Sequence, residues 1–164
     1  MTSGSRSISR KPLSGRRIAE SPPPYVARVL YVESSALIAA LLEGDEQAAT
    51  ALRSEATLVT SALTFAECKR ALVRAAHAGR LSTARAALLS QALNTFAARC
   101  ATVSVTSEIL ERAAEPFPVE PVRTLDGIHL ATLAAVSGPT ESVRVLTRDV
   151  RVTANVLAMG FAIA

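Results

Sequence analysis

The stretch RVLYVESSAL, residues 28–37, is a short apolar run that ends in a glutamate followed by two serines. The run predicts a strand over 28–33, because branched and aromatic side chains favour strands. Serine is a good helix cap, so a helix is expected over 34–42 with either serine as its N-cap. Since the serines can supply that cap, Glu33 requires a different explanation, such as a buried partner or a place in a cleft.

The alternation of short apolar runs and alanine-rich helical segments continues along the chain. This pattern is typical of α/β proteins, and it predicts one domain with a central parallel sheet of about four to five short strands flanked by helices. Strands are expected over residues 28–33, 56–60, 101–105, 143–147 and 161–163, and helices over residues 34–42, 45–54, 61–77, 82–99, 107–114, 124–136 and 149–158.

Residues 1–24 differ in composition from the rest of the chain. They are rich in Ser, Arg, Gly and Pro, and they hold five basic residues against one acid. We expect a disordered basic tail over 1–24 and a folded domain over 25–164. The tail lacks the apolar core of a secretory signal, and its Arg and Ser bias also fits a transit peptide or a nucleic-acid-binding arm. The net charge of +4 describes this tail, because the rest of the chain has equal numbers of acids and bases.

Composition and missing motifs exclude several classes of protein. Aromatic residues make up 4% of the chain and tryptophan is absent, which argues against base-stacking platforms. Every apolar run is shorter than the roughly 18 residues of a membrane span. Cys68 and Cys100 lack CxxC spacing, so they are expected to be reduced, partly buried thiols of a cytoplasmic protein. The motifs of serine hydrolases, P-loop proteins and dinucleotide-binding proteins are also absent.

Four acidic residues occupy positions that a parallel sheet would bring to one edge. Glu33 and Asp149 follow expected strands. Asp126 lies in the first turn of an expected helix, and Glu67 lies on another helix that follows a strand. Ligands of open parallel sheets gather at the carboxyl ends of the strands. Crowded carboxylates repel one another unless a cation holds them, and oxygen ligands of this kind select Mg²⁺ or Mn²⁺. Such an ion can activate water against a phosphodiester.

Each of these acids also has a simpler explanation when it is considered alone. Asp126 and Asp149 could cap a helix or complement its dipole, and Glu67 could be an exposed helix residue. His129 lies three residues after Asp126 on the same helix face, where it could pack in the core or donate a hydrogen bond to the site. His77 is expected to be exposed to solvent. The sequence alone leaves these alternatives open.

The segment between Glu67 and Glu108 contains no acid, whereas basic residues are frequent there. Such a strip suits the phosphate backbone of a nucleic acid, and a solvated helix face explains it equally well. The basic strip consists of Lys69, Arg70, Arg74, Arg80 and Arg85.

Four blocks of the sequence resemble, in the same order, the characteristic blocks of PIN domains. The blocks are LYVESSALIAALL, TSALTFAECKRAL, VRTLDGIHLATLAAV and VLTRDVRVTANVLAMGF, and together they span about residues 28–164. A single block has little specificity, whereas four blocks in order with the expected spacing are fairly specific. Among PIN domains, the length and layout are most similar to those of VapC-type toxins from toxin–antitoxin pairs.

The resemblance implies a Mg²⁺- or Mn²⁺-dependent endoribonuclease toxin that hydrolyses RNA phosphodiesters with metal-activated water. It also implies a homodimer that acts in the cytoplasm without membrane association and is inhibited by a VapB-like antitoxin. Matched by position, the resemblance implies catalytic roles for Glu33, Glu67, Asp126 and Asp149, metal ligation by Glu33, Asp126 and Asp149, and supporting roles for Ser35, Thr147 and Arg123.

The chain departs from the family at its first acid, where PIN domains carry aspartate and this chain carries Glu33. The additional methylene moves the carboxylate by roughly 1.5 Å, whereas Mg²⁺ requires oxygen ligands at about 2.0–2.1 Å. The alternative hypothesis is therefore a PIN-fold module that binds RNA or an antitoxin with impaired catalysis. A phosphatase-type α/β enzyme is a more distant alternative, because the DxD pattern of that class is absent.

Overall fold

The centre of the molecule is a sheet of five parallel strands in the order β3-β2-β1-β4-β5. The computed structural model describes residues 28–54, 56–138 and 142–164, so the tail expected over 1–24 and the expected domain start at residue 25 lie outside the described residues. The parallel sheet with its flanking helices confirms the predicted α/β class. The strands are β1 (Arg28–Val32), β2 (Thr57–Ser61), β3 (Ala101–Val103), β4 (Ser142–Leu146) and β5 (Ala162–Ile163).

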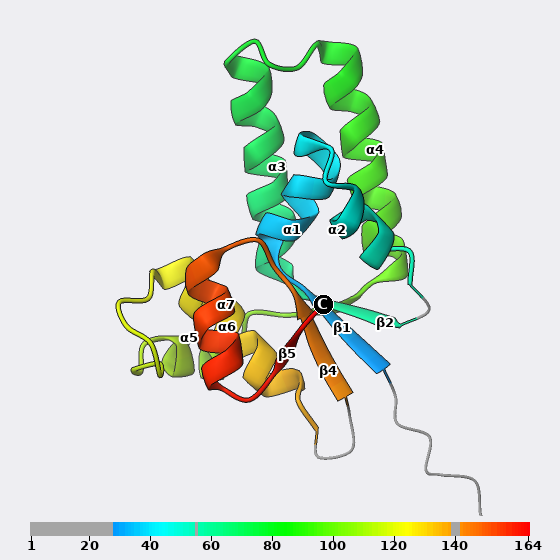
Figure 1. The fold of residues 1–164 in the computed structure, drawn as a ribbon. Helices are drawn as coiled ribbons and strands as arrows, with labels where there is room; N and C mark the ends of the chain where they lie inside the picture. The colour runs from blue at the N-terminus through cyan, green and yellow to red at the C-terminus, as the bar shows by residue number, and fades with distance from the viewer. Residues whose placement is uncertain (1–27, 55, 139–141) are drawn as a thin grey trace, which may run out of the picture.

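The helices form two groups around the sheet. In Figure 1, α3 and α4 form a long hairpin that extends away from the sheet with α1 and α2 beside it, whereas α5, α6 and α7 gather on the other side. The helices are α1 (Ser34–Ile38), the π-helical turn η1 (Ala39–Glu43), α2 (Glu46–Ala51), α3 (Ala62–His77), α4 (Thr83–Arg99), α5 (Ser107–Ala113), α6 (Thr124–Val136) and α7 (Val150–Ala158).

β1 is the middle strand, and its side chains contribute to both halves of the core. Val29 and Tyr31 pack in the cluster that includes α5, α6 and α7. Leu30 and Val32 pack in the cluster that includes α1, α3 and α4. Successive side chains of a strand point to opposite faces, so an uninterrupted apolar run is what a strand covered on both faces requires. The covered strand holds the residue that follows it, Glu33, in a defined place.

The junction after β1 differs from the prediction in two respects. The N-cap of α1 is Glu33, whose carboxylate accepts a hydrogen bond from the backbone N of Ser35 at 3.0 Å. The expectation that a serine caps this helix was therefore wrong, because the hydroxyls of Ser34 and Ser35 donate to the same carboxylate. The helix expected over 34–42 is also shorter, since its second half is the π-helical turn η1, which ends at Gly44 with φ of 73°.

A serine caps α4, because the side chain of Ser82 accepts a hydrogen bond from the backbone N of Arg85. Both cysteines are free and buried, and burial raises the pKa of Cys68 to about 12 and that of Cys100 to about 11. His77 is exposed, as predicted. Among the described residues, no helix combines the length and the apolar character that a transmembrane span needs.

Candidate functional site

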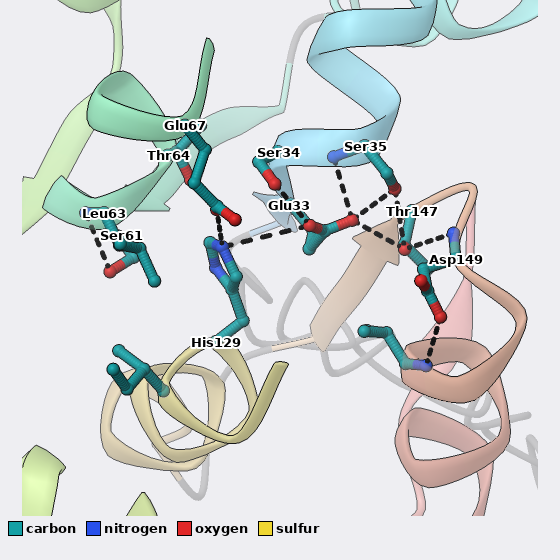
Figure 2. Close-up of polar contacts among 12 residues, drawn as sticks. Glu33, Ser34, Ser35, Ser61, Leu63, Thr64, Glu67, His129, Thr147 and Asp149 are labelled. Carbon is teal, nitrogen blue, oxygen red and sulfur yellow. Dashed lines mark hydrogen bonds and ion pairs between the residues drawn. The ribbon is translucent and has the colours of Figure 1, made fainter. Parts of the chain in front are cut away.

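The candidate site lies where the carboxyl ends of β1 and β4 meet. Val32 pairs with Leu146 across these parallel strands, and the backbone N of Glu33 donates to the carbonyl O of Leu146 at 2.9 Å. Glu33 and Thr147, the residues that follow the two strands, therefore lie next to each other (Figure 2). The sheet thus brings together residues that are more than a hundred positions apart in sequence.

The carboxylate of Glu33 is buried, with 4% of the residue exposed, and is held by several donors. Its Oε1 accepts from Ser34 Oγ at 2.7 Å. Its Oε2 accepts from Thr147 Oγ1 at 2.9 Å and from both the backbone N and the hydroxyl of Ser35. Hydrogen bonds of this kind compensate a buried charge for its lost hydration. Ser35 and Thr147 therefore contact the first predicted acid and fix its orientation.

His129, on α6, lies between two of the predicted acids. Its Nε2 is 2.7 Å from Oε2 of Glu67 and 3.8 Å from Oε1 of Glu33. Its Nδ1 is 3.2 Å from the hydroxyl of Tyr31, and the residue is 2% exposed. Figure 2 shows the imidazole bridging the two carboxylates. From the sequence, His129 was expected either to pack in the core or to donate a hydrogen bond to the site, and its contact with Glu67 fits the second alternative.

Glu67 is neither a plain exposed helix residue nor fully buried, since 22% of its side chain is exposed. Burial raises the pKa of its carboxyl, but the hydrogen bond and the charge of His129 outweigh burial and hold this pKa below its ordinary value. Arg74, from the basic strip, also lowers the pKa of Glu67. The contact with His129 therefore favours the ionised form of Glu67.

Asp126 has no comparable set of donors. Its Oδ2 is buried and lacks a hydrogen-bond partner, and it is the only such side-chain atom in the part of the chain that the structure describes. Burial raises the pKa of Asp126, and the charges of Asp149 and Glu33 raise it further, whereas Arg123 partly opposes them. The N-cap of α6 is Arg123, which makes no side-chain capping bond. Hydrogen bonding therefore does not explain why a carboxylate occupies this position.

Asp149 has a structural role of its own. Its Oδ1 accepts from the backbone N of Arg151 at 2.7 Å and of Val152 at 3.2 Å, so it caps α7, as one of the alternatives proposed. Its backbone N donates to Thr147 Oγ1 at 3.1 Å, which ties it to the network around Glu33. The capping bonds occupy one carboxylate oxygen, and the charge of Asp149 still acts on Asp126.

Within the described residues, one group of three acidic, histidine or cysteine side chains has its ligand atoms all within 4.8 Å of one another. This group, which we call the acid–histidine cluster, consists of Glu33, Glu67 and His129. It shares Glu33 with the metal ligands expected from the sequence, and it does not include Asp126 or Asp149. Metal ligation by Glu33, Asp126 and Asp149 therefore stays a prediction, while the cluster provides a second arrangement that is compact enough to hold a cation.

The basic strip lies on α3, on α4 and in the connection between them, and all of its side chains are exposed. Arg74 and Arg80 line a groove of about 290 Å³ between η1 and the α3–α4 hairpin. Because the charge of Arg74 acts on Glu67, the strip approaches the acids. The acid Glu43 lines the same groove, so a nucleic-acid path along the strip stays a prediction.

Arg148 attaches the loop between Thr147 and Asp149 to the start of α2. Its backbone N donates to Ser35 Oγ at 2.8 Å, and its Nε donates to Asp45 Oδ2 at 2.6 Å. The side-chain hydrogen bond from Arg148 lowers the pKa of Asp45 to about 2 from its ordinary value of 3.8. The ion pair therefore links the candidate site to a neighbouring helix.

We expect Asp45→Asn to remove a pH dependence of stability. The pKa of Asp45 is lower in the folded protein than in the unfolded chain, so its contribution to stability is complete above about pH 4 and is lost as pH falls towards 2. Asparagine caps helices as well as aspartate does, so the cap on α2 is retained. Thermal unfolding at pH 2 to 6 should show wild type and variant converging at the acidic end. The exposed neighbour Glu46, changed to glutamine, is the control, and a constant difference across pH would contradict the prediction.

Comparison with known families identifies the class of protein. The family model of the PIN domain matches residues 30–154. The match covers most of the chain, so the protein belongs to the PIN domain family. No curated protein sequence matches the chain.

A solved structure shows a similar fold. The chain resembles one in the crystal structure of VapBC2 from Rickettsia felis bound to a DNA fragment from their promoter, with a TM-score of 0.58 and 10% sequence identity. The similarity covers 83% of this chain and 97% of that chain. At this level of identity the likeness establishes the fold.

Proposed function

We propose that this PIN domain is a Mg²⁺- or Mn²⁺-dependent endoribonuclease toxin of the VapC type. The observation that carries the proposal is the buried Asp126 oxygen, which has no hydrogen-bond partner among the described residues and lies in the field of Asp149 and Glu33. Carboxylates arranged in this way repel unless a cation is present, and oxygen ligands suit hard divalent ions. The residues present therefore fit the metal that the family implies.

The chain's own residues would orient the reactants. Ser34, Ser35 and Thr147 restrict rotation of the Glu33 carboxylate, so it is preorganised to hold the ion together with Asp126 and Asp149. A bound divalent ion supplies an activated water and stabilises charge on the phosphate. Glu67, which is partly exposed and held by His129, would orient the attacking water by accepting a hydrogen bond. Arg123 opposes the excess negative charge at Asp126.

The direct test is cleavage of RNA by the purified protein after separation from any bound antitoxin. We expect cleavage with added Mg²⁺ or Mn²⁺, complete loss of cleavage with EDTA, and recovery when the metal is restored in excess. Cleavage of a labelled circular RNA, which has no free ends, would show that the enzyme is an endonuclease. Cleavage that persists in EDTA, or no cleavage of any RNA with either metal, would argue against the proposal.

The basic strip is proposed as the path of the RNA backbone. Arg74→Glu combined with Arg80→Glu should weaken RNA binding by on the order of tenfold and reduce the slope of log affinity against log salt by roughly one to two, because fewer phosphates are neutralised. The measurement is fluorescence anisotropy of a labelled RNA at several salt concentrations.

The matched control for the basic strip reverses the charge of two arginines at the opposite side of the sheet, where the strands begin. Arg28 and Arg144 are exposed and line the same groove there, and changing both to glutamate alters the net charge equally. We expect a much smaller effect on affinity and on the salt slope. Equal effects of the two double variants would mean that net charge, rather than the strip, controls binding.

A VapB-like antitoxin and a second copy of this chain are the proposed protein partners, and the cytoplasm is the proposed place of action. The similarity of fold to a chain of VapBC2 supports this part of the proposal. Co-expression with the product of a short reading frame next to the gene should suppress cleavage, and the two proteins should co-purify. The alternative of a binding module with impaired catalysis is motivated by Glu33, and the substitution of that residue decides between the two.

A further inference from the structure

The two ring nitrogens of His129 face different partners. On one side its Nε2 lies 2.7 Å from Glu67 Oε2 and 3.8 Å from Glu33 Oε1. On the other side its Nδ1 lies 3.2 Å from the hydroxyl of Tyr31, which is also 3.2 Å from the carbonyl O of His129. The imidazole thus points one nitrogen at two carboxylates and the other at a hydroxyl that has two possible acceptors.

We infer that His129 is a nitrogen ligand for a cation held by the acid–histidine cluster, and that this ligand makes the site prefer Mn²⁺ to Mg²⁺. The inference rests on the proposed function and concerns a cation at this cluster, which shares Glu33 with the proposed ligands Glu33, Asp126 and Asp149. Imidazole is a good ligand for first-row transition ions, whereas Mg²⁺ strongly prefers oxygen. A set of two carboxylates and one imidazole therefore differs in selectivity from a site built from carboxylates alone.

Contact with Tyr31 allows His129 to adopt either neutral tautomer, with the proton on Nε2 or on Nδ1, without losing the hydrogen bond at Nδ1. The Tyr31 hydroxyl lies 3.2 Å from both Nδ1 and the carbonyl O of His129, so it can act towards the imidazole as donor or as acceptor. When Nε2 carries the proton and donates to Glu67, the Tyr31 hydroxyl donates to Nδ1. When Nδ1 carries the proton, it donates to Tyr31, whose hydroxyl turns to the carbonyl O of His129. The second tautomer leaves the Nε2 lone pair facing the two carboxylates.

The length of Glu33 is part of the same arrangement. An aspartate would withdraw the carboxylate by roughly 1.5 Å along its side chain, and the observed 3.8 Å between Oε1 and Nε2 depends on the longer reach. Glu33 and His129 therefore both contribute to one compact cluster with Glu67.

The test measures the metal directly. Mn²⁺ bound to the intact protein should show coupling to a histidine ¹⁴N nucleus in electron spin-echo spectra, and this coupling should disappear in His129→Gln. Titrations of Mn²⁺, and of Mg²⁺ in competition with it, should show that the preference for Mn²⁺ falls about tenfold or more in the variant. His77→Gln is the matched control, because His77 is exposed and lies at the far end of α3, and it should behave as wild type.

Tyr31→Phe gives a second and milder variant, because it keeps the aromatic ring that packs in the core. It should lower the affinity for Mn²⁺ by less than His129→Gln does, with the nitrogen coupling retained. If Mn²⁺ binds to the wild type without nitrogen coupling, and His129→Gln keeps the same metal preference, the inference is wrong while the proposed nuclease survives. If no divalent ion binds and no RNA is cleaved, the proposed function itself is wrong.

Discussion

Asp126→Asn should reduce RNA cleavage by at least about 100-fold in kcat/KM, because it removes a charge that the site needs when the phosphate is attacked. The side chain keeps its size, so the packing of α6 should be unchanged. The expected readout is loss of cleavage at saturating Mg²⁺ or Mn²⁺, with wild-type circular dichroism and wild-type RNA binding at low salt. An asparagine variant that cleaves as fast as the wild type would remove Asp126 from the mechanism.

The same substitution should not destabilise the metal-free protein. The pKa of Asp126 is raised in the folded state by burial and by the neighbouring acids. The folded protein therefore binds this proton more tightly than the unfolded chain does, and stability decreases as pH rises above the ordinary value of 3.8. Asparagine cannot ionise, so in EDTA at neutral pH its thermal midpoint should equal or exceed that of the wild type. Added Mn²⁺ should then stabilise the wild type more than the variant.

Glu108→Gln is the appropriate control for Asp126→Asn, since Glu108 also lies in the first turn of a helix and is exposed. It should leave cleavage and the response to metal unchanged. If the control and Asp126→Asn had the same effect on the thermal midpoint, the helix dipole rather than the crowding of acids would explain the stability of both.

The sequence was sufficient for the fold because local and global signals agree. The apolar run of β1 fits a strand covered on both faces, and its alternation with helical segments favours helices on both sides of a parallel sheet. The π-helical turn η1 was not predictable, since nothing in the residues 39–43 distinguishes it from the α-helix expected there. The cap at Glu33 was also missed, because a serine was expected there, whereas the hydroxyls of Ser34 and Ser35 donate to the Glu33 carboxylate instead.

The positions of Glu33, Glu67 and Asp149 could be anticipated because each stands at a strand end or on the helix that directly follows a strand, whereas Asp126 stands in the first turn of a helix that follows another helix. Their catalytic and metal-binding roles stay predictions. His129 was undervalued for a physical reason. Its contacts are to Glu67 and Tyr31, which are 62 and 98 positions away in sequence, so no local pattern encodes them. The available signal was the spacing of His129 and Asp126 on one face of α6, and that spacing suits a packed histidine equally well.

Glu33→Asp should reduce cleavage by on the order of 100-fold, because a displacement of roughly 1.5 Å in a reacting site is large enough for such a loss. The shorter side chain can still cap α1. It would, however, withdraw from the hydroxyls of Ser34 and Thr147, which now donate to it at 2.7 and 2.9 Å. Losing hydrogen bonds to a buried charge costs about 1.5–3 kcal/mol, so the free energy of unfolding should fall by a similar amount in denaturant titrations.

Ser34→Ala tests whether cleavage depends on the position of the Glu33 carboxylate or on the number of hydrogen bonds that this carboxylate accepts. It removes the donor to Oε1 while the bonds from Ser35 and Thr147 keep the carboxylate in place. Its effect on cleavage should therefore be much smaller than that of Glu33→Asp, although both variants lose stability. The impaired-site alternative makes the opposite forecast for Glu33→Asp, since restoring the family's aspartate should then raise cleavage. Whether Glu33→Asp lowers or raises the rate of cleavage therefore decides whether the hydroxyls around Glu33 support an active site or an impaired one.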